Sequence, residues 1–269
     1  MNRKLFLLLI ISSLLLASFS ACGRNSDPAF SHPVIIGDPV GSFDVGIAFW
    51  PGNEQLQEQV WAGLQLLSAQ GVVANLGTRW LGATSLHIPP SQTAVSRLET
   101  ITPRTLIVGV NPESAPFSFY NEQGELIGLD VDLAQALCTL FGWELVVLPV
   151  PWSQREFYLN SGNIDLLLGA NLTESVTRRL IYTPPIWENP QVIVTMSDSG
   201  IVRLRDTREQ GLSVQEGSIS EYVAYQNAER LGEIIQYDTQ AGLISAFESG
   251  RASAILIDLH VANFLLHAR

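Results

Sequence analysis

The chain has 269 residues, of which 46% are hydrophobic and 15% are charged, and its formal net charge is −11. This composition is typical of a folded globular protein, and the acidic surplus excludes a surface that follows the phosphate backbone of a nucleic acid. Lys4 is the one lysine. A chain that loses its first residues therefore has no lysine for a Schiff base, a P-loop or a kinase site.

Residues 1–21 have the charged start, the apolar stretch and the small-residue end of an export signal. Cys22 follows Ser20 and Ala21, as at a lipoprotein cleavage site, although Phe19 stands where leucine is usual. We therefore expect a lipid on Cys22 and a polar tether over residues 22–32 that anchors the protein outside the cytoplasmic membrane. The alternatives are a signal peptide cut without lipidation and an uncleaved anchor.

The next segment is predicted to form a strand and two helices. The strand is Val45 to Phe49, and residues 51–53 form a turn. A 3.6-residue apolar spacing then predicts an amphipathic helix that breaks at Gly71, followed by a short helix that ends at Gly82. Residues 83–103 contain three prolines and are predicted to be a linker.

A buried strand from Leu106 to Val110 runs into a loop rich in turn-forming residues, and a hairpin around Asn121 and Gly124 follows. A helix comes next, with Asp130 and Asp132 in its first turn, where negative charge is favourable. Its apolar face is predicted to contain Leu133, Ala136, Leu137, Leu140 and Phe141.

The rest of the chain alternates strands with helices. A strand at 145–150 precedes a helix that Ser153 caps and that ends at Gly162. The apolar strand 164–169 leads to a helix that begins at Thr173, and an extended segment with three prolines covers 181–195. The last strands are predicted at 211–215, 233–237 and 254–258, with helices at 219–231, 240–249 and 259 to the end. Ile219, Tyr222 and Val223 are expected to face inward. This alternation indicates parallel sheets with helices on both faces.

Three short motifs, GVNP at 109–112, APF at 115–117 and GLDVDLA at 128–134, stand in an order and at a spacing that resemble the bacterial extracellular solute-binding proteins of family 3. The resemblance implies an α/β, two-lobed type II periplasmic-binding-protein-like fold, in which each lobe is a mostly parallel sheet flanked by helices. It also implies a monomer that captures a small polar solute, an amino acid or related amine, and delivers it to the permease of an ABC transporter. We expect no enzyme activity and no cofactor, since no Ser-His-Asp, metal or phosphate motif supports catalysis. We also expect no metal, because the four histidines lack metal-ligand spacing.

The order of segments differs from that family. There, a strand, a long helix and a short helix ending W-x-G come last, whereas here they occupy residues 43–82. We therefore predict a circular permutant, in which residues 83–103 join the old termini. Lobe I would contain 43–82 and 104–196, and lobe II would contain 33–42 and 197–269. A truncated or tandem relic is the alternative.

Two residues stand out as ligand contacts. Asp258 ends a buried strand, where a carboxylate faces the cleft and suits an ammonium group, and the resemblance implies that it holds an α-amino group. The alternative is that Asp258 caps the next helix. The resemblance makes Trp152 an aromatic floor for the ligand, and the alternative is core packing.

The resemblance implies further ligand-binding residues in three loops. They are Asn111, Glu113 and Ser114; Gly169, Ala170, Asn171 and Thr173; and Gln215, Gly217 and Ser218. The family's carboxylate-binding arginine is replaced by Val176, and Arg179, one helical turn on, is a substitute with a longer reach. This departure argues against an ordinary α-amino acid as the ligand and leaves a related amine or a different polar solute as the alternatives.

Two other functions remain open. A few extracellular dehydratases share this fold, and an enzyme of that kind would need an acid or base in the cleft, for which Glu113 and Asp258 are the candidates. A ligand-sensing module of a membrane receptor is the other alternative.

Overall fold

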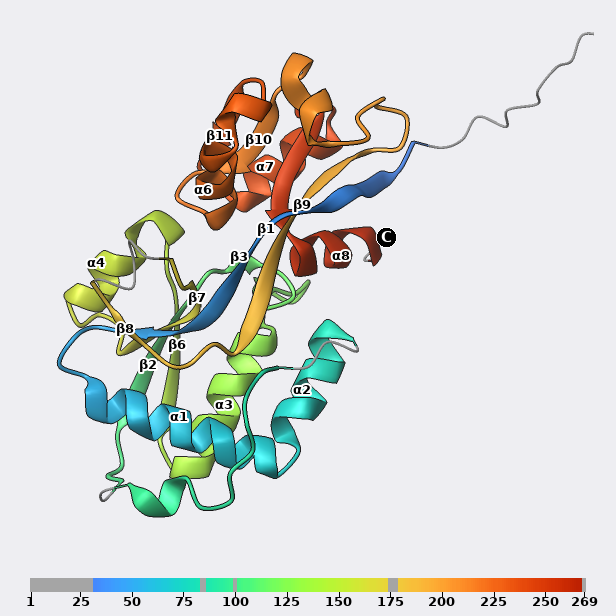
Figure 1. Ribbon diagram of the computed structural model, residues 1–269. Coiled ribbons are helices and arrows are strands. Elements are labelled where there is room, and N and C mark those ends of the chain that lie inside the picture. The colour runs from blue at the N-terminus through green and yellow to red at the C-terminus, as the bar shows by residue number, and fades with distance from the viewer. Residues whose placement is uncertain (1–30, 83–85, 99–100, 174–178, 268–269) are drawn as a thin grey trace, which may run out of the picture. The chain divides into compact units, whose positions relative to one another are not determined.

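The computed structural model describes residues 31–82, 86–98, 101–173 and 179–267 (Figure 1). The expected export signal, Cys22, most of the expected tether and Val176 lie outside the described residues. The helix expected to begin at Thr173 falls on residues 174–178, which also lie outside them. None of the helices in the described ranges is long and apolar enough to cross a membrane.

A mixed sheet of nine strands organises the described residues, in the order β11-β10-β12-β9-β1-β7-β2-β6, with β8 paired to β1. Its strands are β1 (Pro33–Phe49), β2 (Thr105–Val110), β6 (Glu144–Pro149), β7 (Leu166–Asn171), β8 (Ile181–Tyr182), β9 (Trp187–Met196), β10 (Leu212–Gln215), β11 (Ile234–Tyr237) and β12 (Ala254–Asp258). The pairs β2–β6, β2–β7, β10–β11 and β10–β12 are parallel. The strands β1 and β9 pair with each other and with their outer neighbours in the antiparallel direction, so the sheet is mixed.

The N-terminal strand β1 lies in the middle of this sheet. It pairs with β9 from Pro33 opposite Met196 to Val45 opposite Trp187, with an irregularity between Ile36 and Gly41. Its last residues pair with β7, which pairs with β2. The predicted strand Val45 to Phe49 therefore shares a sheet with Leu106 to Val110, with β7 between them (Figure 1).

Helices cover both faces of the sheet (Figure 1). The first half of the fold, which contains β2, β6 and β7, includes α1 (Glu54–Ala69), α2 (Val72–Leu81), α3 (Leu129–Phe141) and α4 (Arg155–Asn160). The second half, which contains β10, β11 and β12, includes α6 (Ile219–Gln226), α7 (Gln240–Glu248) and α8 (Leu259–His267). The 3-10 helices are η1 (Val95–Arg97), η2 (Trp152–Gln154), η3 (Leu204–Glu209) and η4 (Ala228–Arg230). A separate small sheet contains β3 (Glu113–Ser114), β4 (Ser118–Tyr120) and β5 (Leu126–Ile127).

Each half has apolar cores on both faces of its strands. In β7, Leu166 and Leu168 join one core and Leu167 joins the core on the opposite face. In β12, Ile255 and Leu256 are divided between two cores in the same way. Because neighbouring residues of a strand point to opposite faces, a strand covered on both sides is apolar throughout, as the runs at 164–169 and 254–258 predicted.

The start of α3 is fixed against the loop that follows β2. Gly128 has φ +135°, and a Cβ built on it would lie 2.1 Å from the carbonyl oxygen of Phe117. The next two N–H groups, of Leu129 and Asp130, donate to the carbonyls of Pro116 and Phe117. Only glycine permits this approach, which places Asp130 directly below the loop that holds Asn111 and Ser114.

Several local expectations were wrong. Ser153 does not cap a helix, because the chain first makes η2 and α4 begins after Gln154. The helix expected over 219–231 ends at Gln226 and is followed by η4, and Tyr222 is 44% exposed instead of facing inward. Asp130 lies in the first turn of α3, as predicted, but it is only 2% exposed.

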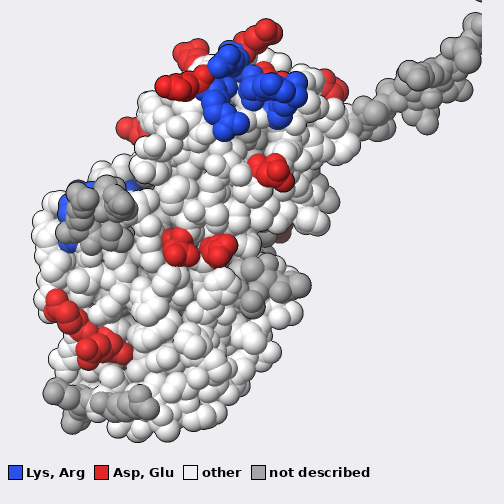
Figure 2. All heavy atoms as spheres, viewed as in Figure 1, with Lys and Arg blue, Asp and Glu red and all other residues white. Residues whose placement is uncertain are grey.

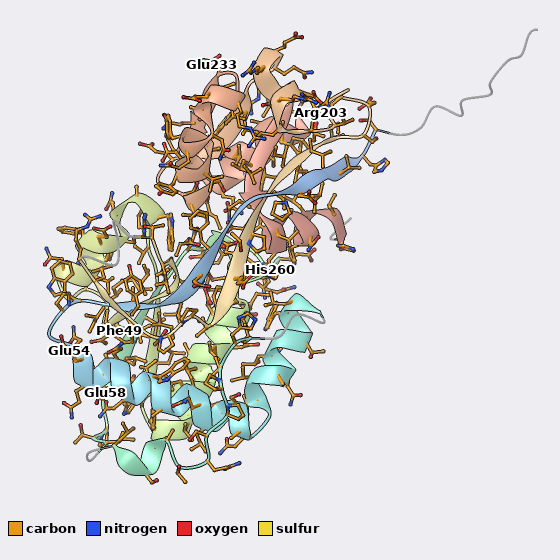
Figure 3. All side chains as sticks on the ribbon, viewed as in Figure 1. Phe49, Glu54, Glu58, Arg203, Glu233 and His260 are labelled. Atoms are coloured by element: carbon orange, nitrogen blue, oxygen red, sulfur yellow. The ribbon has the colours of Figure 1, made fainter. Side chains whose placement is uncertain are left out.

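Charged side chains are sparse on the face shown in Figure 2 and gather at the end of the second half near η3. There Arg203 pairs with Asp206 at 3.2 Å, and Arg208 donates to the carbonyl of Glu229. Figure 3 places Arg203 and Glu233 in this region, far from the labelled His260. The mixed-sign segment at 203–209 is thus a local surface network, as expected of alternating charge.

Candidate functional site

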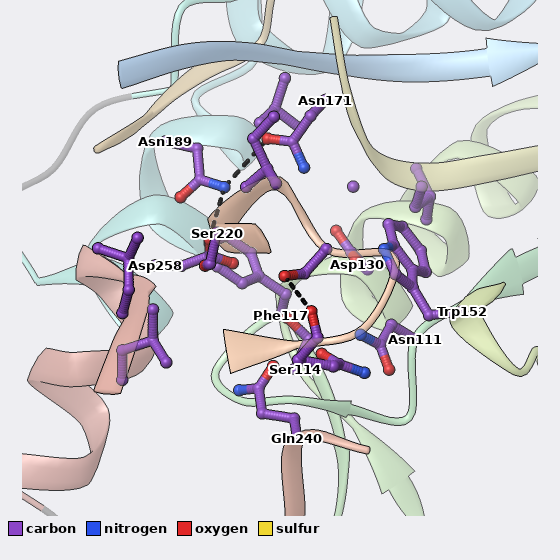
Figure 4. A pocket seen from close by; sticks show the side chains of 18 of the residues that line it. Asn111, Ser114, Phe117, Asp130, Trp152, Asn171, Asn189, Ser220, Gln240 and Asp258 are labelled. Atoms are coloured by element: carbon purple, nitrogen blue, oxygen red, sulfur yellow. Dashed lines mark hydrogen bonds between the residues drawn. The ribbon is translucent and has the colours of Figure 1, made fainter. Parts of the chain in front are cut away.

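A central cleft lies where the two halves of the fold meet (Figure 4). The loop after β2, the turn η2 and the end of β7 contribute its walls from the first half. The ends of β10 and β12 and the start of α6 contribute them from the second half, and β9 crosses its floor. The residues that line the central cleft are Val45, Asn111, Ser114, Phe117, Asp130, Trp152, Leu168, Gly169, Asn171, Trp187, Asn189, Gln215, Ser218, Ile219, Ser220, Gln240, Leu243, Leu256, Ile257 and Asp258.

Eight predicted ligand-binding residues line the central cleft together: Asn111, Ser114, Trp152, Gly169, Asn171, Gln215, Ser218 and Asp258. They come from five strand ends and turns that the sequence separates by up to 147 positions, and the sheet brings them to one edge. This is the position at which open α/β sheets bind ligands.

A second space, the side cavity, lies next to the central cleft and is lined by Trp152, Arg155, Glu156, Leu167, Ala170, Asn171, Thr173, Leu180, Gly217, Ser218, Ile219, Glu221, Tyr222 and Tyr225. It holds the predicted residues Ala170, Thr173 and Gly217. Trp152, Asn171, Ser218 and Ile219 line both spaces. The two spaces are therefore neighbouring parts of one ligand-sized region between the halves.

Two predicted residues lie elsewhere. Glu113 lines a different groove against α7 and α8, where its Oε2 accepts from the N–H of Ala241 at 3.2 Å. Arg179 is exposed and makes an ion pair of 2.9 Å with Glu156. Neither side chain lines the central cleft or the side cavity.

Asp258 is held by two amides from the crossing strand β9. Its Oδ1 accepts from Asn189 Nδ2 at 2.9 Å and from Gln191 Nε2 at 2.6 Å. Asn189 Nδ2 also donates to Asn171 Oδ1 at 3.1 Å, and Gln191 accepts from Ser220 at 2.6 Å. These bonds link strands and helices of both halves, and Figure 4 shows Asn189 between Asn171 and Asp258. Among the hydrogen bonds of the described residues, no backbone N–H of α8 donates to Asp258. The position of Asp258 therefore favours a role in the cleft over a role as the cap of α8.

The cleft is lined by two carboxyl groups, the buried Asp130 and the half-buried Asp258. Burial raises the pKa of Asp130 to about 7, and its Oδ1 has no hydrogen-bond partner in the described part of the chain. Burial also raises the pKa of Asp258, while the bonds from Gln191 and Asn189 and the nearby His260 act in the opposite direction. No ion pair of the described residues includes either group. A ligand with an ammonium or guanidinium group would supply the missing charge.

Trp152 combines packing with exposure to both spaces. It packs against the core below α4, and Arg155 Cζ lies 4.8 Å from the centroid of its ring. Phe117 is 5% exposed, stacks on Trp187 at 4.9 Å between ring centroids and also lines the cleft. Trp152 therefore packs against the core and also lines the cleft.

The sequence analysis missed the polar residues of β9 and the role of Asp130. Asn189 and Gln191 are i and i+2 on β9, in a segment that continues as the apolar run 192–194, and Gln191 is completely buried. Two amides on one face of a buried strand need partners, which is a signal that the sequence contained. Ser220 and Gln240 gave no such signal, because each lies in the first turn of a helix, where polar residues are common.

The described residues contain no group of three or more His, Cys, Asp or Glu side chains that would hold a metal ion. Cys138 is fully buried in α3. The chemistry of the central cleft is therefore that of amides, hydroxyls, indole and two carboxyl groups.

A model of the bacterial extracellular solute-binding proteins, family 3, matches residues 106–256. The arginine-binding extracellular protein ArtP of Bacillus subtilis is 28% identical over 60% of this chain and 63% of its own length. The histidine-binding periplasmic protein of Escherichia coli K12 is 26% identical over 58% of this chain and 61% of its own length. The chain thus spans less than two thirds of these relatives.

A solved structure of an ABC uptake transporter substrate-binding protein of Streptococcus pneumoniae with bound histidine is 28% identical. It covers 61% of this chain, which covers 70% of it, with a TM-score of 0.59. The likeness confirms the α/β fold of the two-lobed periplasmic-binding type. The family match begins at 106, after β1, α1 and α2.

Proposed function

Because the chain belongs to the bacterial extracellular solute-binding proteins, family 3, we propose that it captures an amino acid or a related small polar amine in the central cleft and delivers it to an ABC transporter. The observation that carries the proposal is the position of Asp258. Its carboxylate lies at a strand end in the cleft, oriented by Asn189 and Gln191 and without a cation of its own among the described residues. Such a group binds an ammonium group by a charge-assisted hydrogen bond.

The named relatives support an amino-acid ligand, since they bind arginine or histidine. Two carboxyl groups in one cleft, Asp130 and Asp258, favour a ligand with a positive charge over an acidic one. The test is a thermal-shift and calorimetric screen of the purified protein against the amino acids and polyamines. A ligand raises the melting temperature by binding the folded state. If no member of the panel binds, the proposal is wrong.

We also propose that Cys22 carries a lipid that holds the protein at the outer face of the cytoplasmic membrane, as a monomer. The support is the sequence around the expected cleavage site, which lies outside the described residues. Replacing Cys22 with Ala is expected to move the protein from the membrane fraction to the soluble fraction of cells labelled with palmitate. A wild-type protein that incorporates no palmitate would contradict the lipid anchor.

The order of segments in the chain is proposed to be a circular permutation. Residues 43–82 complete the first half, since β1 pairs with β7 and α1 packs on α3, where a Cβ on Gly63 would lie 2.5 Å from Leu137. The C-terminal helix α8 lies beside β1 in Figure 1. A rearranged chain that starts at residue 104 and carries residues 33–82 after 267 is expected to fold and to bind the same ligand. Failure of this rearranged chain to fold would favour the relic alternative.

We propose binding without chemical conversion, and one observation keeps the enzyme alternative testable. Asp130, with its pKa near 7, shares the cleft with Asp258, and a carboxyl group of that pKa suits general acid–base chemistry. Glu113, the other candidate acid, lies in a different groove. Prolonged incubation with each bound ligand, followed by NMR of the recovered solute, is expected to return it unchanged. A ligand recovered in altered form would establish an enzyme.

A further inference from the structure

A further space, the α2–α8 pocket, lies between the end of α2 and one face of α8. Its volume is about 430 Å³, larger than that of the side cavity at about 350 Å³. Figure 1 shows α2 and α8 on one side of the fold, and α4 and α6, which flank the side cavity, on the other. The described lining of the α2–α8 pocket includes Trp80, Leu81, His260, Asn263, Phe264 and His267.

We propose that the α2–α8 pocket binds an uncharged planar aromatic molecule that carries an O–H or N–H donor, of the phenol or indole type. Its described lining shares no residue with the described lining of the central cleft or of the side cavity. The pocket is therefore a second site, and the inference goes beyond the proposed function instead of resting on it. A volume of about 430 Å³ is within the range of small-molecule sites.

The helix α8 uses two different faces. Val261, Ala262 and Leu265 pack into a core of the second half. The four residues of α8 that line the pocket stand at i, i+3, i+4 and i+7, which is one face of a helix. They are His260, Asn263, Phe264 and His267. The large apolar ring of Phe264 is 36% exposed on this face, so part of it is available to an occupant of the pocket.

The two aromatic walls of the pocket are held in place by their neighbours. Trp80 Nε1 donates to Asp132 Oδ2 at 2.8 Å, and Arg79 Cζ lies 5.0 Å from the centroid of the indole ring. The ring of Phe119 contacts both walls, at 6.0 Å from Trp80 and 5.2 Å from Phe264 between centroids. Since these rings are positioned before a molecule binds, little side-chain entropy is lost on binding.

The electrostatics of the pocket favour an uncharged occupant. Although the chain has a net charge of −11, its described lining contains no Asp, Glu, Lys or Arg. The charged residues nearest to Trp80, Arg79 and Asp132, pair with each other at 3.0 Å. A charged molecule would lose hydration in the pocket without meeting an opposite charge there, whereas a neutral aromatic ring would bury apolar surface against Trp80 and Phe264.

The two histidines give the pocket hydrogen-bond acceptors. His267 Nδ1 lies 2.6 Å from the carbonyl oxygen of Asn263. A carbonyl only accepts, so Nδ1 carries the proton and Nε2 of the neutral ring is an acceptor. Burial lowers the pKa of His260, while Asp258 and a hydrogen bond to the backbone of Glu188 act in the opposite direction. Burial thus favours a neutral His260, which also has one unprotonated nitrogen. These acceptors match the O–H of a phenol or the N–H of an indole.

The experiment compares two aromatic donors with their methylated counterparts, which lack the donor. The probes are indole with 1-methylindole and phenol with anisole, titrated into the full protein at pH 8 and followed by ligand-observed NMR. We expect indole to bind the wild type with a Kd on the order of 1 mM or below. Each donor should bind at least about threefold more tightly than its methylated counterpart, which corresponds to one hydrogen bond between neutral groups.

Two variants locate the site. Asn263→Trp places a bulky ring in the pocket from an exposed position of α8 and is expected to abolish binding of all four probes. Asn75→Trp is the matched control, since Asn75 is exposed on α2 and outside the described lining of the pocket, and it should bind like the wild type. His267→Phe keeps the ring but removes the acceptor. It should reduce the preference for the donors to below about twofold, with binding of the methylated probes unchanged.

Melting temperatures show that each variant remains folded. A wild type that binds none of the four probes would overturn the inference, as would binding that survives in folded Asn263→Trp, because the probes would then occupy another site. Equal binding of donors and methylated probes by the wild type would overturn the proposed chemical class. The screen with amino acids and polyamines tests the central cleft alone, so failure of that screen and failure of this experiment are distinguishable.

Discussion

Asn189 Nδ2 lies 2.9 Å from Asp258 Oδ1, and this hydrogen bond joins the crossing strand β9 to the end of β12. Gln191, two residues further along β9, donates to the same oxygen at 2.6 Å. Both bonds use one oxygen of the carboxyl group. The other oxygen, Oδ2, accepts no hydrogen bond from the described residues, and the two bonds from β9 fix the orientation of the carboxyl group.

Asp258→Asn is expected to weaken binding of an amine ligand by more than about tenfold, or about 1.4 kcal/mol or more. The variant removes the charge but retains an oxygen that can accept from Asn189 and Gln191, so the fold is conserved. Calorimetry with the ligand found in the screen measures the loss. Asp38→Asn, at an exposed position of β1, is the control and should bind like the wild type. Equal affinity of Asp258→Asn and the wild type would remove Asp258 from the site.

Asp130 should make the stability of the ligand-free protein depend on pH. Burial raises its pKa from 3.8 to about 7, so the folded state binds the proton more tightly than the unfolded state. The free energy of unfolding is therefore expected to fall as the pH rises from about 4 to about 7, and the contribution of Asp130 levels off above that.

Asp130→Asn removes this contribution, and urea denaturation of both proteins across the range measures the difference. The variant is expected to gain stability relative to the wild type as the pH rises, while Asp258 affects both proteins alike. Asp238→Asn, at an exposed position, is the control. A difference between Asp130→Asn and wild type that stays constant with pH would contradict the assignment.

Gly128→Ala is expected to lower the free energy of unfolding by more than about 3 kcal/mol. Its Cβ would lie 2.1 Å from the carbonyl oxygen of Phe117, and its φ of +135° is unfavourable for any side chain. Gly124→Ala is the matched variant, because Gly124 also has a positive φ, +77°, but has open space around it. It should cost only about 1–2 kcal/mol. Similar urea midpoints for the two variants would show that the close approach at Gly128 relaxes easily.

Glu113 and Asn111 are two residues apart but are expected to behave differently. Asn111 lines the central cleft, whereas the carboxylate of Glu113 accepts from the N–H of Ala241 in a separate groove. Glu113→Gln should change the Kd of the ligand by less than about twofold, and Asn111→Ala should weaken binding by more than that. Calorimetry on both variants decides. A large effect of Glu113→Gln would mean that the contact with α7 changes when the ligand binds.

The sequence predicted the elements more securely than it predicted their ends or their exposure. Continuous apolar runs identified β7 and β12, because strands covered on both faces leave no polar positions. The burial of Asp130 was not predicted, because it depends on the close packing that Gly128 permits at the start of α3. Tyr222 was misjudged because helical spacing does not show where the neighbouring strand ends.

Within the site, strand ends were predictable and partners were not. Asp258, Asn111 and Asn171 each follow or end a strand, and parallel strands bring such residues to one edge. The ion pair between Arg179 and Glu156 depends on how the two residues meet in space, so the sequence did not predict it. The same pairing removed Arg179 from the candidates that the structure brings together.

The antiparallel pairing of β1 with β9 continues from one half of the fold into the other, through Phe43 opposite Asn189 and Asp44 opposite Glu188. Here any opening or closing must twist a hydrogen-bonded double ribbon, and Asn189 lies on that ribbon with its amide on Asp258. A twist of the paired strands β1 and β9 would therefore also change the orientation of the Asp258 carboxyl group.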